Sequence, residues 1–137
     1  MNHVVPGNQG LLKRALTGNA TFSALCGIGI FLFDRKLVAF LGLPGQVSLA
    51  ILGVCLIGYA VSLWLNARRT RVRIAEAWIA VGMDLAWVIG SYALIFAIPF
   101  SLGGKWTIAL LAEAVLGFAI LQWFGIRRVQ RSAPKVA

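Results

Sequence analysis

The sequence has little of what most catalytic and metal sites are built from. Its 137 residues include two cysteines, one histidine and four acidic residues. The cysteines, Cys26 and Cys55, form no Cys-x-x-Cys pair, so the usual zinc, haem and dithiol motifs are absent and no disulfide framework is expected. No Ser-His-Asp set, phosphate loop or nucleotide motif is present either. We therefore expect neither an enzyme nor a protein with a bound cofactor.

Charged side chains are also scarce, and they are confined to short segments. Only 12% of the residues are charged, 60% are apolar and the mean hydropathy is +0.86, which is far outside the composition of an ordinary soluble domain. A bilayer core about 30 Å thick is crossed by about 20 residues of helix, each rising about 1.5 Å. Four such helices fill a chain of this length, so we expect one membrane domain over residues 1–137.

Charged residues and turns divide the chain into four apolar segments. The predicted spans are Ala15 to Phe33, Gln46 to Asn66, Glu76 to Ile98 and Lys105 to Ile126. A Leu-Pro-Gly turn at 43–45 separates the first two spans, and residues 37–43 should lie at the interface or extend the first helix. A basic loop, 67–75, and a short basic tail, 127–137, follow the second and fourth spans. The predicted fold class is all-α, an antiparallel four-transmembrane-helix bundle.

The basic residues are divided unequally between the two sides of this bundle. Ten of the 13 fall on the side of the termini and the middle loop, namely Lys13, Arg14, Arg68, Arg69, Arg71, Arg73, Arg127, Arg128, Arg131 and Lys135. Only Arg35, Lys36 and Lys105 lie opposite. The positive-inside rule then predicts a multi-pass protein of the cell (inner) membrane with both termini in the cytoplasm. With this distribution, the net charge of +9 indicates contact with anionic lipid headgroups rather than with nucleic acid.

Small residues recur at four-residue spacing and predict where helices pack. Lipid supplies no hydrophobic drive between helices, so helices associate where small side chains let their backbones approach. The clearest stripe is Gly82, Ala86 and Gly90, in the third span. Weaker stripes are Asn19, Ser23 and Gly27 in the first span, Gly58 and Ser62 in the second, and Ala109, Glu113 and Gly117 in the fourth. These stripes could build the bundle, a homodimer or a larger membrane complex.

Two carboxyl groups fall inside the predicted spans, on Asp84 and Glu113. A charge at that depth costs about 2.5 to 3.5 kcal/mol on the insertion scale, so each is a functional candidate. Asp84 follows Glu76 by eight residues and lies about 12 Å deep, while Glu113 follows Trp106 by seven and lies about 10 Å from the other face. The two carboxyl groups would therefore pair directly only after a shift in helix register.

The position of Asp84 also constrains the third span. At about 100° per residue, Asp84 lies on the opposite side of its helix from Gly82 and Ala86. A carboxyl group cannot comfortably face lipid, so this helix should be central in the bundle or should form an oligomer contact. Asn19 and Gln122 complete a ladder of intramembrane polar groups with Asp84 and Glu113, which we interpret as interhelical hydrogen bonding or as a functional site.

Three functional hypotheses follow. The first is a structural, accessory or interaction subunit of the membrane, with Asp84 and Glu113 as interhelical glue. The alternative is a small carrier or channel in which these two acids bind protons or a cation. Cys26 and Cys55 lie at similar depth and are weak candidates for a soft metal, because two thiols alone make a poor site. An enzyme is the least favoured class, since no nucleophile and base are paired in the sequence.

Overall fold

The computed structural model describes residues 6–133. A short 3-10 helix, η1 (Pro6–Gln9), precedes five α-helices: α1 (Gly10–Leu32), α2 (Asp34–Leu41), α3 (Ala50–Arg68), α4 (Ile74–Ala97) and α5 (Leu102–Arg131). All but α2 are long and apolar enough to cross a membrane. The predicted fold class, an all-α bundle of four membrane-spanning helices, is thus confirmed. The end of the predicted tail, residues 134–137 with Lys135, lies outside the described residues.

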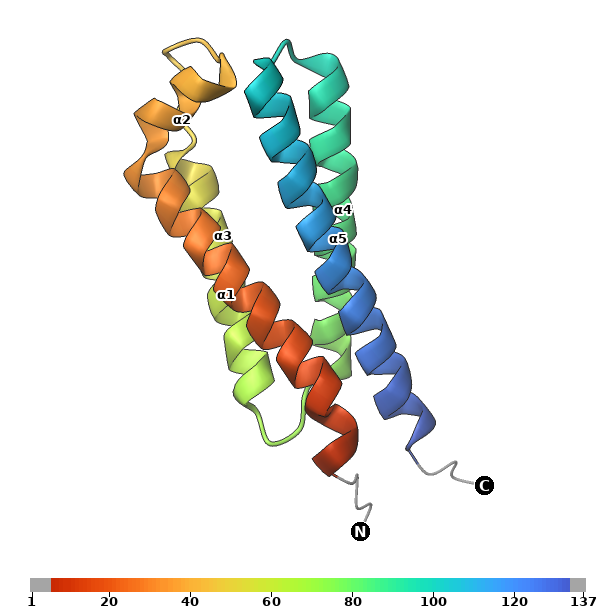
Figure 1. Cartoon of the computed structure of the whole chain (residues 1–137). Helices are drawn as coiled ribbons and strands as arrows, with labels where there is room; N and C mark the ends of the chain where they lie inside the picture. Colours follow the sequence, from red (N-terminus) through yellow and green to blue (C-terminus); the bar gives the residue numbers. More distant parts are fainter. Residues whose placement is uncertain (1–5, 134–137) are drawn as a thin grey trace.

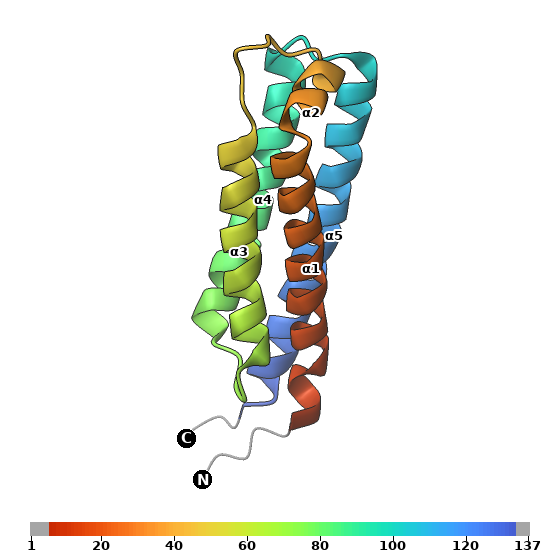
Figure 2. The same cartoon turned by 90° about the vertical axis from the view of Figure 1, so that its left-hand side faces the viewer.

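The four long helices form two antiparallel hairpins, α1 with α3 and α4 with α5 (Figure 1). Figure 2 shows them running up and down beside one another, with α2 at the end away from the termini. The buried apolar core lies in the half near the termini and consists of Leu12, Leu16, Ala20, Leu63, Ala67, Val72, Ala77, Ala80, Val81 and Ile126. The hairpins are therefore packed together at this end, and Figure 1 shows them separating toward the other.

The region between the first two spans differs from the prediction. Helix α1 ends at Leu32, and a break at Phe33 makes α2 a separate helix rather than an extension. Helix α3 begins at Ala50, four residues later than predicted, where the Asp34 carboxylate accepts hydrogen bonds from the Leu49 N–H (2.6 Å) and the Ser48 hydroxyl (3.0 Å). A carboxylate at a helix N-terminus also suits the helix dipole. Asp34 thus fixes where this span starts.

Ser101 joins the two hairpins at the end away from the termini. Its side chain caps α5 by accepting a hydrogen bond from the Gly104 N–H (2.9 Å), and its hydroxyl donates to the Phe40 carbonyl of α2 (2.6 Å). Its backbone N–H donates to the Leu41 carbonyl (2.9 Å). The last turn of α2 closes with Gly42 in a left-handed conformation (φ 74°), which glycine adopts without strain. Helix α2 therefore connects the two hairpins at this end through its hydrogen bonds with Ser101.

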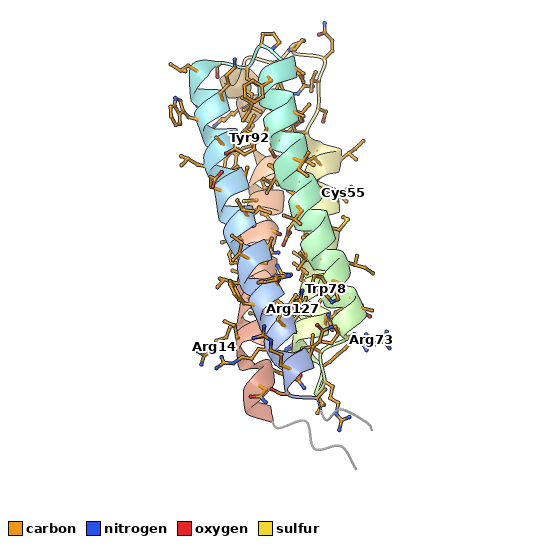
Figure 3. All side chains as sticks on the ribbon, turned by 90° about the vertical axis from the view of Figure 1, so that its right-hand side faces the viewer. Arg14, Cys55, Arg73, Trp78, Tyr92 and Arg127 are labelled. Atoms are coloured by element: carbon orange, nitrogen blue, oxygen red, sulfur yellow. The ribbon has the colours of Figure 1, made fainter. Side chains whose placement is uncertain are left out.

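The end near the termini carries most of the basic residues, and polar side chains connect its elements. Arg14, Arg73 and Arg127, which come from three different helical regions, all lie there (Figure 3). Arg127 stacks on the Trp123 ring, with 5.3 Å from guanidinium carbon to ring centroid. The Gln9 side-chain carbonyl accepts a hydrogen bond from the Val72 N–H (3.1 Å), which joins the N-terminal turn to the loop between α3 and α4. A cationic, aromatic rim of this kind is typical of a membrane interface.

Of the four predicted small-residue stripes, only the one on α1 is buried inside the bundle. In α1 the stripe is buried, and a Cβ added at Gly27 would lie 2.8 Å from the Gly53 carbonyl oxygen of α3, so glycine is required for this close approach. The predicted packing surface on α4 is wrong for the bundle itself, because Gly82 and Ala86 are exposed. The stripes on α3 and α5 also face outward, at Gly58, Ser62, Glu113 and Gly117.

Candidate functional site

One carboxyl group, that of Asp84, is bonded to a side chain from each of the other three spans. The Asn19 amide of α1 donates to Asp84 Oδ2 (2.7 Å), and the Gln122 amide of α5 donates to the same oxygen (2.8 Å). The Tyr59 hydroxyl of α3 donates to Oδ1 (2.8 Å). Asp84 is 3% exposed, and Asn19 and Gln122 are fully buried. This arrangement, called the Asp84 cluster below, sits between the two hairpins.

The helix lengths explain why these side chains meet. Tyr59 precedes Ala67 by eight residues and Asp84 follows Glu76 by eight, so both lie about 12 Å from the end of the bundle that carries the termini. Asp84 occupies the buried face of α4 together with Ala77, Ala80 and Val88. A residue at this depth and on this face must point between the hairpins. The helical phase therefore places the carboxyl group inside the protein rather than in lipid.

Asp84 is held entirely by neutral donors. A carboxylate offers about four acceptor positions, and three are taken here, which leaves one on Oδ1. The Tyr59 hydroxyl also lies 3.2 Å from the Ala80 carbonyl oxygen, so its single proton has a second acceptor when Oδ1 is otherwise engaged. Among the described residues, both ion pairs of Lys or Arg with a carboxylate involve Glu76, not Asp84. The cluster can therefore still accept a cation.

Gln122 and Asn19 support the carboxyl group unequally. The Asn19 carbonyl oxygen accepts a hydrogen bond from Ser23 (3.2 Å), so both ends of its amide are bonded. The Gln122 Oε1 atom is the one buried side-chain nitrogen or oxygen in residues 6–133 without a partner. Turning the Gln122 amide by 180° would bring this acceptor toward Asp84, where it could meet a protonated carboxyl group. The Gln122 amide can therefore donate to an ionised Asp84 or, once turned, accept from a protonated one.

A cavity of about 150 Å³ adjoins the cluster, and residues of all four spans line it. It is lined by Phe22, Ser23, Cys26, Ile30, Leu52, Cys55, Leu56, Tyr59, Met83, Asp84, Trp87, Leu111 and Val115. The exposed Cys55 of α3 and Met83 of α4 stand on its wall, so the cavity opens sideways between these two helices. A cavity of this size holds a group about as large as benzene.

The cavity wall combines one carboxyl group with three aromatic rings, those of Phe22, Tyr59 and Trp87. Aromatic faces attract cations, and more strongly when the cation is removed from water. A carboxylate adds charge neutralisation, whereas the remaining wall is apolar and disfavours a strongly hydrated ion. The arrangement therefore fits a small organic cation with apolar substituents better than it fits a metal ion.

The two cysteines line this cavity but make no metal centre by themselves. Cys26 is half-buried and Cys55 exposed, and both are free thiols. Within residues 6–133, no three of the His, Cys, Asp and Glu side chains lie close enough together to hold a metal ion. The sequence placed both cysteines at one depth, and they do line the same wall. Their role as metal ligands stays a prediction without further support.

Glu113 is separate from the Asp84 cluster. It lies on the exposed face of α5, and its Oε1 accepts a hydrogen bond of 2.5 Å from the Tyr92 hydroxyl of α4. Figure 3, which looks onto α4 and α5, shows Tyr92 in the half away from the termini. The predicted ladder is therefore split, because Asn19, Asp84 and Gln122 meet whereas Glu113 does not join them.

Sequence reasoning missed both tyrosines. The chain has only two, Tyr59 and Tyr92, and each donates to one of the two intramembrane carboxyl groups. A buried tyrosine hydroxyl usually needs a partner, and tyrosine in membranes prefers the interface. Two tyrosines within predicted spans, rather than at their ends, were a signal that each had a polar partner there.

Comparison with protein-family models, with curated proteins and with solved structures finds no match to this chain.

Proposed function

We propose that this chain is a small multi-pass membrane protein that binds a hydrophobic organic cation at Asp84, as the recognition element of a carrier. The observation that carries the proposal is a buried carboxyl group that pairs with no basic residue within 6–133, on the wall of an apolar, aromatic cavity that opens sideways into the membrane. A charge in a membrane normally pairs with an opposite charge or serves a pathway. Here the opposite charge is supplied by the ligand.

Recognition would proceed without displacing the supporting helices. A cation entering from the lipid side between α3 and α4 would contact the aromatic rings of the cavity wall and Asp84 Oδ1, which has an acceptor position left. The Tyr59 hydroxyl then turns to the Ala80 carbonyl, while Asn19 and Gln122 keep hold of Oδ2. Since Gln122 can also accept from a protonated carboxyl group, exchange of the cation for a proton requires only local rotations. Such an exchange would couple transport to protons.

The proposal is tested by binding of phenyltrimethylammonium, measured by equilibrium dialysis with the protein in lipid nanodiscs. The neutral control is tert-butylbenzene, which has the same shape with carbon in place of the charged nitrogen. We expect wild type to bind the cation at least ten-fold more tightly than its neutral analogue, after subtraction of partition into empty nanodiscs. Equal affinity for the two compounds would show that the carboxyl group does not recognise charge.

Asp84→Asn and Glu113→Gln are matched variants for this test, because each replaces an intramembrane acid by its amide. Asp84→Asn should fold, since the Gln122 Oε1 atom can accept from the new amide. It should lose the preference for the cation and keep the affinity for tert-butylbenzene. Glu113→Gln should leave both affinities unchanged, because Glu113 does not line the cavity.

A structural or accessory subunit is the second candidate function. One observation favours it, namely that Asp84 joins all four spans through three hydrogen bonds. In that case Asp84→Asn would change the free energy of unfolding and would leave cation binding as weak as in wild type. The dialysis experiment and an unfolding titration of the same two proteins therefore separate the candidates.

The location in the cell is part of the proposal. The start of α1, the basic loop and the end of α5 lie at one end of the bundle, and they carry nine of the basic residues within 6–133. The positive-inside rule places this end in the cytoplasm and the protein in the inner membrane, with anionic lipid headgroups around the arginines. A reporter fused after the C-terminus should be active only as a cytoplasmic marker, and activity of a periplasmic marker would reverse this orientation.

A further inference from the structure

The exposed carboxyl group of Glu113 is not accounted for by the cavity. It lies about 10 Å inside the membrane face marked by Trp106, on a surface that would otherwise meet lipid tails. Its partner among the described residues is the neutral Tyr92. The nearest basic residues along α5, Lys105 and Arg127, are eight and 14 residues away, which is about 12 and 21 Å along the helix. Glu113 therefore needs a polar neighbour from outside this chain.

The surface around Glu113 is also open enough for a close neighbour. Gly117, one turn along α5, has no atom within 4 Å of the position that a Cβ would take, and Ala93, next to Tyr92 on α4, is exposed. Gly82 is exposed as well, about 15 Å further along α4 toward the termini. Opposite this surface on α4, Asp84 is buried. The bundle therefore does not use the exposed small residues of α4 for its own packing. They are free to contact another molecule.

We propose that the outer face of α4 and α5 around Glu113 and Tyr92 is the contact surface of a parallel homodimer. When every copy inserts in the orientation proposed above, a two-fold axis normal to the membrane brings these residues of both copies to the same depth. Within each copy the Tyr92 hydroxyl already donates to Glu113, and two Glu113 carboxyl groups that share one proton across the axis complete the hydrogen bonding. A second copy thus supplies the missing partner without any group foreign to the chain.

The dimer would leave the ligand cavity accessible. The cavity opens between α3 and α4, whereas Glu113 lies on α5 and Tyr92 on the side of α4 that contacts α5. A shallow groove of about 310 Å³ continues the contact surface toward the end with the termini, between Val81 and Leu85 of α4 and Ile120 and Phe124 of α5. Side chains of the second copy can fill this groove. Dimer formation and cation binding are therefore separable.

The proposal is tested by counting subunits of the labelled full chain in large vesicles, by single-molecule photobleaching over a dilution series. Wild type should be dimeric at high density and should dissociate on dilution. Glu113→Leu, which removes the acceptor, should shift the midpoint of dissociation to at least ten-fold higher density. Wild type that stays monomeric throughout, or a Glu113→Leu variant with an unchanged midpoint, would overturn the proposal, and the first result would indicate that a different protein contacts Glu113.

A matched pair of glycine variants locates the surface. Gly117→Leu and Gly58→Leu both add a side chain at an exposed glycine without a near neighbour, one beside Glu113 and the other on α3. Gly117→Leu should weaken the dimer at least ten-fold, because the added side chain holds the two copies apart, whereas Gly58→Leu should leave it unchanged. Equal effects of the two substitutions would contradict a dimer through α4 and α5. Neither residue packs in the bundle, so both variants are expected to fold.

Discussion

The two intramembrane acids of this protein have opposite surroundings. Asp84 is buried between the hairpins and accepts three hydrogen bonds from three helices, whereas Glu113 is exposed on α5 and accepts one. Both are carboxyl groups at a depth where lipid cannot solvate them. The difference shows that a span can satisfy an acid inside its own bundle or can leave it for a molecule outside. Helical phase decides between these outcomes, since Asp84 shares the face of the buried residues of α4 and Glu113 lies opposite those of α5.

The largest expected effect comes from replacing each acid by leucine. Asp84→Leu leaves the two buried amides of Asn19 and Gln122 without an acceptor, whereas the Tyr59 hydroxyl can still donate to the Ala80 carbonyl. At about 1 kcal/mol or more for each amide, the free energy of unfolding should fall by at least about 2 kcal/mol. Glu113→Leu loses only the hydrogen bond from Tyr92 on the lipid face, so it should change the free energy of unfolding by less than about 1 kcal/mol. Unfolding titrations in mixed micelles, at a dilution that keeps the protein monomeric, measure both values. Equal losses would mean that the two acids do not differ as described.

The next effect distinguishes the two amides that hold Asp84. Asn19 is bonded at both ends of its amide, whereas the Gln122 Oε1 atom has no partner within residues 6–133. Asn19→Leu breaks two hydrogen bonds, while Gln122→Leu breaks one and removes an unsatisfied acceptor. The first substitution should therefore be more destabilising than the second by about 1 to 2 kcal/mol in the same titration. The reverse order would show that Gln122 is the main support.

The smallest effect concerns the two tyrosines. Tyr59→Phe removes a donor from the buried acid and should cost about 1 kcal/mol, whereas Tyr92→Phe removes the donor from the exposed acid and should cost about half as much or less in the monomer. In the vesicle experiment the order should be inverted, with Tyr92→Phe weakening the dimer and Tyr59→Phe leaving it unchanged. If Tyr59→Phe weakened the dimer, the Asp84 cluster and the surface around Glu113 would not be independent of each other.

The fold followed from the sequence because its signals are local. Apolar runs bounded by charge and by Pro-Gly turns located four helices, and the depth of Asp84 followed from its distance to Glu76. The start of α3 did not follow, because it depends on the Asp34 carboxylate, 15 residues before Leu49 in the chain, and no local pattern reports that contact.

The composition of the site was only partly predictable for a related reason. Asn19, Asp84 and Gln122 were singled out because polar side chains are rare in a span. Their meeting depends on how two hairpins pack, which a single sequence does not specify. The small residues of α4 were assigned to bundle packing, yet Gly82 and Ala86 face outward, since spacing defines a stripe but not the molecule that it contacts.

The separation of the two acids is tested most directly by measuring cation binding and subunit number on the same preparations of Asp84→Asn and Glu113→Leu. The structure predicts that Asp84→Asn loses the preference for phenyltrimethylammonium over tert-butylbenzene and remains dimeric. It predicts the converse for Glu113→Leu, which should keep the cation preference and become monomeric at densities where wild type is dimeric. A variant that loses both properties together, or an Asp84→Asn protein that still prefers the cation, would contradict this account.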